Sequence, residues 1–79
     1  MTPQECWSWV VAGESGGQWP EATLLVAWTL RSWQVYLDMP ASEVGPLWGW
    51  QGWREPTWEA IQAVNEVWER PLIESPFQW

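Results

Sequence analysis

The sequence predicts a mainly α-helical fold: a small three-helix domain with an ordered loop that is rich in tryptophan and glycine. Three segments carry apolar residues at helical spacing behind residues that start helices. Glycines and prolines interrupt the segment between the second and the third, which argues against a strand there. The chain is 79 residues long, so we expect one domain, residues 1–79, with one hydrophobic core.

The first helix is expected over residues 3–14. Thr2, Pro3 and Glu5 form a capping-box pattern, in which the threonine caps the helix and the glutamate reaches back to it. Apolar residues follow at spacings of three and four, and this spacing places Cys6 on the buried face as an inert thiol. Gly13 and the glycines after it end the helix.

The second helix is expected over residues 20–37, with Pro20 and Glu21 in its first turn. This segment is apolar nearly all round, which is typical of a central, buried helix. Trp28 lies among its leucines and valines, and we therefore expect Trp28 to be a core residue.

Residues 38–56 are expected to form an ordered loop that its indoles hold against the helices, with one short helical turn at residues 42–44. The third helix is expected over residues 57–70, where Pro71 ends it. The apolar stripe of this helix is predicted to comprise Trp58, Ile61, Val64 and Trp68.

The charge balance excludes several classes of partner and of site. Three arginines, no lysine and ten acidic residues give a formal net charge of -7. These cations are too few to displace counterions from phosphates or to hold the chain on an anionic surface, so we expect neither nucleic acid nor membrane as a partner. With no histidine and one cysteine, the chain cannot form a histidine metal site, a Ser-His-Asp triad or an internal disulfide. We expect no metal and no cofactor.

The N-terminal residues lack the basic region of a secretory signal. The longest apolar stretch falls well short of the ~18 residues that a membrane span needs. We therefore expect the chain to be made in the cytoplasm without a signal peptide.

Glu14 is the residue that most suggests chemistry. It is expected at the C-terminal end of the first helix, followed by glycines that let a substrate approach the backbone. The negative end of a helix and surrounding indoles both raise the pKa of a carboxyl group, as a general acid near neutral pH requires. The alternative is a solvated glutamate in a glycine-rich turn.

The stretch from Val10 to Ser32 reads VVAGESGGQWPEATLLVAWTLRS and resembles the start of SleB-like cell-wall hydrolases. The motif of that family is an apolar helix ending in a glutamate among small residues, followed by an alanine- and valine-rich helix that an Asn-Arg pair closes. Glu14 stands where the family has its catalytic glutamate, and Val26-Ala27 matches its Val-Ala step. Leu30-Arg31 stands at the Asn-Arg pair, without the asparagine. Residues 49–57 are similar to the middle segment of the family, though less specifically.

The resemblance implies a reduced lysozyme-like fold that cleaves the glycan strand of peptidoglycan, as a cell-wall hydrolase or lytic transglycosylase. In that mechanism a single protonated glutamate, Glu14 here, donates to the glycosidic oxygen. The N-acetyl or 6-hydroxyl group of the substrate then completes the reaction. The second carboxylate that ordinary glycosidases need is not required.

Eleven tryptophans provide much of the apolar area that so small a core needs. They cannot all be buried in 79 residues, and sugar rings stack on exposed indole faces. Trp48, Trp50 and Trp53 lie on the glycine-interrupted loop and are the candidate substrate-binding residues. The alternative is that these three indoles belong to the core.

A second hypothesis is a non-catalytic, acidic interaction protein, either an accessory subunit or a homo-oligomer. Tryptophan anchors dominate the energy of protein interfaces, so an exposed indole patch would dock onto a protein partner or a second copy. A homo-oligomer would also enlarge the small core. An open groove beside Glu14 favours the enzyme, whereas an oligomer that covers it favours the interaction protein.

Overall fold

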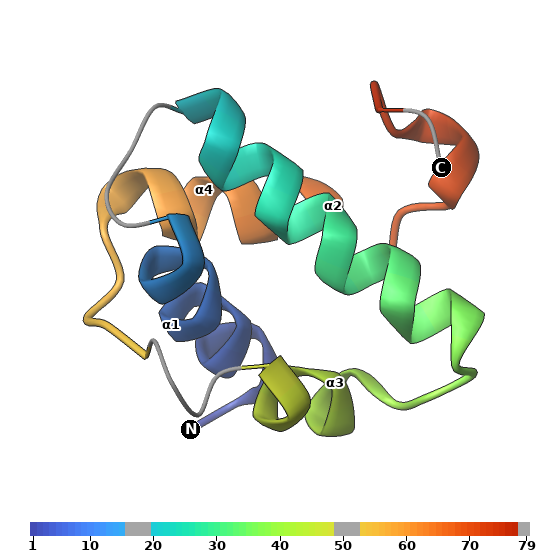
Figure 1. Cartoon of the computed structure of the whole chain (residues 1–79), viewed down its shortest axis with the longest axis horizontal. Helices are drawn as coiled ribbons and strands as arrows, with labels where there is room; N and C mark the ends of the chain where they lie inside the picture. Colours follow the sequence, from blue (N-terminus) through green and yellow to red (C-terminus); the bar gives the residue numbers. More distant parts are fainter. Residues whose placement is uncertain (16–19, 49–52, 78–79) are drawn as a thin grey trace.

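The computed structural model describes residues 1–15, 20–48 and 53–77, which form four α-helices and one 3₁₀ turn (Figure 1). The helices are α1 (Pro3–Ser15), α2 (Pro20–Tyr36), α3 (Ala41–Trp48) and α4 (Trp58–Val67), and the 3₁₀ turn is Leu72–Glu74. These ranges contain no strand, so the prediction of a mainly helical fold is confirmed. None of these helices has both the length and the hydropathy that crossing a bilayer requires.

The start of α1 follows the predicted capping box at Thr2 and Glu5. The Glu5 amide donates to the Thr2 hydroxyl, and the Thr2 amide donates to the Glu5 carboxylate, both at 3.1 Å. The hydrogen bond from the Thr2 amide, together with that of its side chain, lowers the pKa of Glu5. The bounds of α1 and α2 agree with the expected helices to within one residue.

α1 has more buried residues than the other described helices, and it packs against α2, α3 and α4. Its buried residues are Cys6, Trp7, Ser8, Val10, Val11, Ala12 and Ser15. Most of these side chains are small, so three helices can approach the backbone of α1 closely. α2 also packs against the other three helices, as predicted for a central helix, but it is buried along only one face.

α2 is buried along one face. Trp28 is 1% exposed and belongs to the core, as predicted. Val35 and Tyr36 in the last turn are 47% and 80% exposed. This end of α2 extends away from α1 and α4 in Figure 1.

α3 corrects the prediction that residues 38–56 form a loop with one short helical turn. Gly45 and Pro46 are poor helix formers, yet both lie within α3. Val44 is fully buried, and a Cβ placed on Gly45 would stand 2.7 Å from the Sγ atom of Cys6 in α1. Packing against α1 therefore outweighs the weak helix propensity of this segment.

The predicted stripe of α4 is buried only in part: Val64 is buried and Trp68 packs against the core, as predicted. Trp58 and Ile61, predicted to be buried, are 71% and 39% exposed. The buried positions are Ala60, Ala63, Val64 and Val67. The two alanines let α4 approach its neighbours closely, so the small side chains face the core. The helix also ends at Val67 instead of residue 70, because Trp68 has a non-helical ψ of 120° and Glu69 then has a left-handed φ of 60°.

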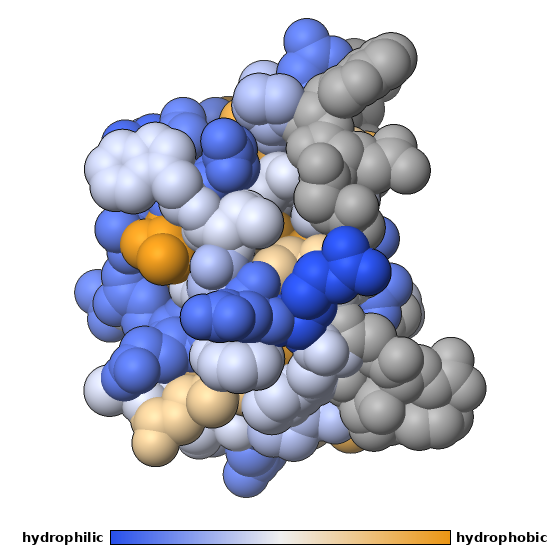
Figure 2. Space-filling view, turned by 90° about the vertical axis from the view of Figure 1, so that its left-hand side faces the viewer, coloured by the Kyte–Doolittle hydropathy of each residue, from blue (hydrophilic) through white to orange (hydrophobic). Residues whose placement is uncertain are grey.

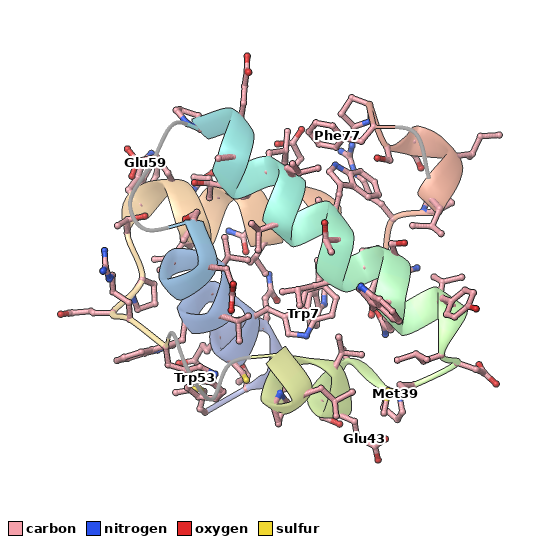
Figure 3. The ribbon with its side chains drawn as sticks, in the orientation of Figure 1. Trp7, Met39, Glu43, Trp53, Glu59 and Phe77 are labelled. Carbon is pink, nitrogen blue, oxygen red and sulfur yellow. The ribbon has the colours of Figure 1, made fainter. Side chains whose placement is uncertain are left out.

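Trp7 lies at the centre of the helices (Figure 3). It is fully buried, and its indole N–H donates a hydrogen bond to the Ala41 carbonyl at 2.9 Å. Its ring meets that of Trp68 edge-on, with 5.0 Å between the ring centroids. Leu72 and Phe77 of the C-terminal segment pack against the same core. Trp7 thus joins α1 to the start of α3 and the end of α4.

Candidate functional site

Glu14 lies in the last turn of α1, where the sequence places it. Its neighbours Val10, Val11 and Ser15 are buried, so the packing of α1 sets the direction in which Glu14 points. Glu14 itself is exposed. The core thus holds the backbone that carries this carboxylate without covering the carboxylate.

A small hollow of about 150 Å³ lies beside Glu14, between α1 and α2. Its other lining residues are Val10, Val26, Thr29 and Leu30. The walls are therefore mainly apolar, and the Thr29 hydroxyl donates a hydrogen bond to the Leu25 carbonyl at 2.8 Å. Glu14 is the one ionisable side chain among the described residues of this lining.

The desolvation that the sequence leads us to expect around Glu14 does not come from the described residues. No tryptophan is among those that line the hollow, and the side chain of Glu14 is exposed. Residues 16–19, which follow this turn, lie outside the described residues.

The hollow is also small for a ligand site. Pockets for small molecules usually measure about 300–1,000 Å³, and this hollow measures about 150 Å³. It has room for one substituent of a larger ligand that lies across the surface.

Trp53 lies near the other end of α1 (Figure 3). Its side chain is 41% exposed and lines a separate hollow together with Met1, Pro3 and Cys6. α1 is about 20 Å long, so the structure does not bring Trp53 and Glu14 to the same hollow. Of the other two candidate substrate-binding residues, Trp50 and the side chain of Trp48 lie outside the described residues.

Cys6 is buried, as predicted, with 8% of its surface exposed. Burial raises the pKa of its thiol. Because the thiolate is the nucleophilic form, a buried thiol that stays protonated is a poor nucleophile. Cys6 is therefore a packing residue.

A second site, between α2 and α4, is missed by the sequence analysis. Trp58 is 71% exposed and lines an open groove of about 270 Å³. Glu21, Glu59 and Glu66 line the same groove. A signal for it is present in the sequence: Trp58, Gln62 and Glu66 are spaced by four residues, which places the indole on the polar face of the helix.

Metal binding and orphaned polar groups give no further site in the part of the chain that the structure describes. Within it, no three histidine, cysteine, aspartate or glutamate side chains are grouped so that they could hold a metal ion. No buried side-chain nitrogen or oxygen there is without a hydrogen-bond partner. Among the described residues, the candidate functional groups are therefore exposed carboxylates and indoles.

Comparison of the chain with protein-family models, with curated proteins and with solved structures finds no match. The resemblance to SleB-like hydrolases therefore depends on the residues quoted above, chiefly those from Val10 to Ser32.

Proposed function

We propose that this protein cleaves the glycan strand of peptidoglycan, with Glu14 as the general acid. The position of Glu14 is the observation that supports this most: an exposed carboxylate at the C-terminal end of α1, on the hollow between α1 and α2. These two helices also carry the resemblance to SleB-like hydrolases. Val10 and Ala27, one from each helix, are fully buried in the same core, so the arrangement is rigid.

The proposed reaction needs one acid from the protein. The protonated Glu14 carboxyl donates its proton to the glycosidic oxygen while the bond between that oxygen and the anomeric carbon breaks. If the 6-hydroxyl of the substrate attacks the anomeric carbon, its proton passes to the Glu14 carboxylate and an anhydro sugar forms. If the N-acetyl oxygen attacks instead, water then opens the new ring and gives up its proton to Glu14. Both routes regenerate the acid without a second carboxylate.

The hollow beside Glu14 suits one apolar substituent of an N-acetylated sugar. Its walls include Val26 and Leu30, and about 150 Å³ has room for an acetyl methyl group while the sugar ring lies across the carboxylate. A ring in that position excludes water from Glu14. The substrate itself thus provides the desolvation that the described protein residues do not.

The test compares Glu14→Gln with Glu43→Gln. Glutamine keeps the shape of the side chain and removes the proton donor, and Glu43 is an exposed glutamate on α3 that does not line the hollow (Figure 3). Release of soluble fragments from purified peptidoglycan should fall at least about 10²-fold in Glu14→Gln. It should not change in Glu43→Gln.

Because both glutamates are exposed, each substitution should change the free energy of unfolding by less than about 0.5 kcal/mol. Loss of activity in Glu14→Gln then reports chemistry and not stability. Equal turnover by the two variants contradicts the proposed role of Glu14. Absence of turnover in the wild type contradicts the proposed function.

The second candidate function, an interaction protein, is favoured by the exposed apolar side chains. Tyr36, Trp58 and Ile73 are 80%, 71% and 91% exposed. On the face drawn in Figure 2, the hydrophobic residues form small, separate areas. The hydropathy scale of that figure gives tryptophan a nearly neutral value, so an exposed indole is not coloured as hydrophobic. Because a net charge of -7 repels a second copy, this candidate points to a different protein as the partner. Sedimentation velocity should then show a monomer.

A further inference from the structure

The groove that contains Trp58 lies between the start of α2 and α4, and it extends along α4 from Trp58 to Glu66. Leu24 and Ala63 belong to its lining and give it an apolar floor, since both are at least partly buried. Figure 3 shows Glu59 at the outer edge of the molecule, where α4 begins. The volume of the groove is about 270 Å³, and it opens to solvent. It is therefore shaped for a side chain or two of an approaching segment.

The indole of Trp58 is the most prominent group of this groove. Trp58 is the first residue of α4, directly after the N-cap Thr57, whose hydroxyl accepts a hydrogen bond from the Ala60 amide at 3.2 Å. The capped turn fixes the backbone of Trp58, while 71% of the residue stays exposed. A large, rigid apolar ring held in place at low conformational cost is the usual anchor of a protein interface.

The charged residues that line this groove are all acidic. Glu21 comes from the first turn of α2, and Glu59 and Glu66 lie two turns apart on α4. No arginine is among the described residues that line the groove, and the chain has no lysine. Arg31, on α2, is engaged elsewhere, since it donates hydrogen bonds to the Arg70 carbonyl and to Gln34.

We infer that this groove docks a basic segment of a partner protein, with an arginine or lysine side chain against Trp58 and an apolar side chain on the floor. A cation over an indole face is attracted by the ring quadrupole. The carboxylates of Glu59 and Glu66 can accept charge-assisted hydrogen bonds from the same segment. An acidic segment or a second copy of this chain would meet repulsion in the same groove. The inference does not depend on the proposed catalytic role of Glu14, which lies outside the groove.

The experiment uses a fluorescent peptide of arginine and leucine at helical spacing as the probe. A second peptide carries citrulline in place of each arginine, which removes the charge and keeps the shape. Fluorescence anisotropy measures the Kd of both peptides for the whole chain at low and at high salt. The wild type should bind the arginine peptide at least about tenfold more tightly than the citrulline peptide, and salt should weaken this binding.

Three variants locate the binding site. Trp58→Ala, which removes the exposed anchor, should raise the Kd about tenfold or more. The double variant Glu59→Gln and Glu66→Gln should raise it several-fold at low salt and make it less sensitive to salt. Gln62→Lys, which adds a cation to the groove without removing a contact, should also weaken binding. Circular dichroism should show that each variant is folded, since all four residues are exposed.

The matched control is the double variant Glu43→Gln and Glu74→Gln, which removes two exposed charges outside the groove. It should bind the arginine peptide like the wild type. An equal loss in this control would show diffuse attraction to an acidic protein and would overturn the inference. So would equal affinity for the citrulline peptide, an unchanged Kd in Trp58→Ala, or no binding by the wild type. None of these outcomes bears on turnover of peptidoglycan by Glu14.

Discussion

Trp7→Phe tests the centre of the core. The indole of Trp7 is fully buried, donates a hydrogen bond to the Ala41 carbonyl at 2.9 Å, and lies edge-on to Trp68 with 5.0 Å between ring centroids. Phenylalanine keeps one aromatic ring but removes the N–H donor and the second fused ring. The matched control is Trp58→Phe, because Trp58 is 71% exposed.

The expected loss for Trp7→Phe has two parts. The hydrogen bond contributes about 1 kcal/mol net, and the lost ring area and packing contribute about 1–2 kcal/mol. The free energy of unfolding should therefore fall by about 2–3 kcal/mol, which lowers the Tm of so small a domain by roughly 8–24 °C. A domain of this size has a total stability of about 4–12 kcal/mol, so the variant should remain folded. Trp58→Phe should change the stability by less than about 0.5 kcal/mol.

Urea unfolding followed by far-UV circular dichroism measures both variants. Fluorescence is a poor probe here, because eleven tryptophans contribute to it and each variant removes one. An unchanged dependence on urea would show that the same surface is exposed on unfolding in each case. Equal midpoints for Trp7→Phe and the wild type, or a larger loss for Trp58→Phe, would refute the assignment of core and surface.

Three further stability predictions and one labelling measurement test local features. Gly45→Ala should lower the free energy of unfolding by about 1–3 kcal/mol, since the new Cβ would stand 2.7 Å from Cys6 Sγ. If the additional substitution Cys6→Ala recovers none of this loss in a double-mutant cycle, the clash is not its cause. Thr57→Ala should cost about 1 kcal/mol in urea unfolding, because the Ala60 amide loses its cap, and Thr57→Ser should cost less. The fold lowers the pKa of Glu5 below its ordinary 4.5, so its stabilisation is present above that pH and is lost as the pH falls through the folded pKa. Glu5→Gln should therefore lower the urea midpoint near neutral pH and match the wild type in strong acid, and a constant difference at all pH values would be inconsistent with this. The thiol of Cys6 should react slowly with a thiol reagent in the folded chain and quickly in urea, because burial raises its pKa; equal rates would count against its burial.

Helix ends that are set by residues close to one another in the sequence could be predicted from the sequence. The capping box of Thr2 and Glu5 sets the start of α1 through hydrogen bonds within one turn, and such bonds follow from the sequence alone. The helicity of α3 could not be predicted in this way. It contains Gly45 and Pro46, and it is stabilised by packing of Val44 and Gly45 against α1, which is distant in the sequence.

The buried face of α4 was predictable from the sequence only in part. A stripe of large residues, such as Trp58 and Ile61, normally predicts the core face. Val64 and Trp68 of the predicted stripe do contact the core, but Ala60 and Ala63 take the place of Trp58 and Ile61, because close approach to the other helices favours small side chains. Trp58 faces outward because the alanines occupy the core face of the helix.

The candidate site was predictable in the part that one helix determines. Glu14 lies in the last turn of α1, as predicted. The glycines that follow it in the sequence are a local signal for the end of a helix, so this position could be predicted. Whether a tryptophan that follows α3 in the sequence lies near Glu14 depends on contacts between segments that are distant in the sequence. Trp53 in fact lies by Met1 and Pro3, in a different hollow.

Mass spectrometry of purified peptidoglycan after incubation with the wild-type protein tests the proposed function most directly. The glycosidic mechanism predicts soluble fragments cut between sugars, with anhydro ends if the 6-hydroxyl attacks and reducing ends if water completes the reaction. These fragments should be missing when Glu14→Gln is used at the same concentration. Wild-type digests that contain no fragments beyond those of the buffer control, or only fragments cut at amide bonds, would contradict glycan cleavage by Glu14.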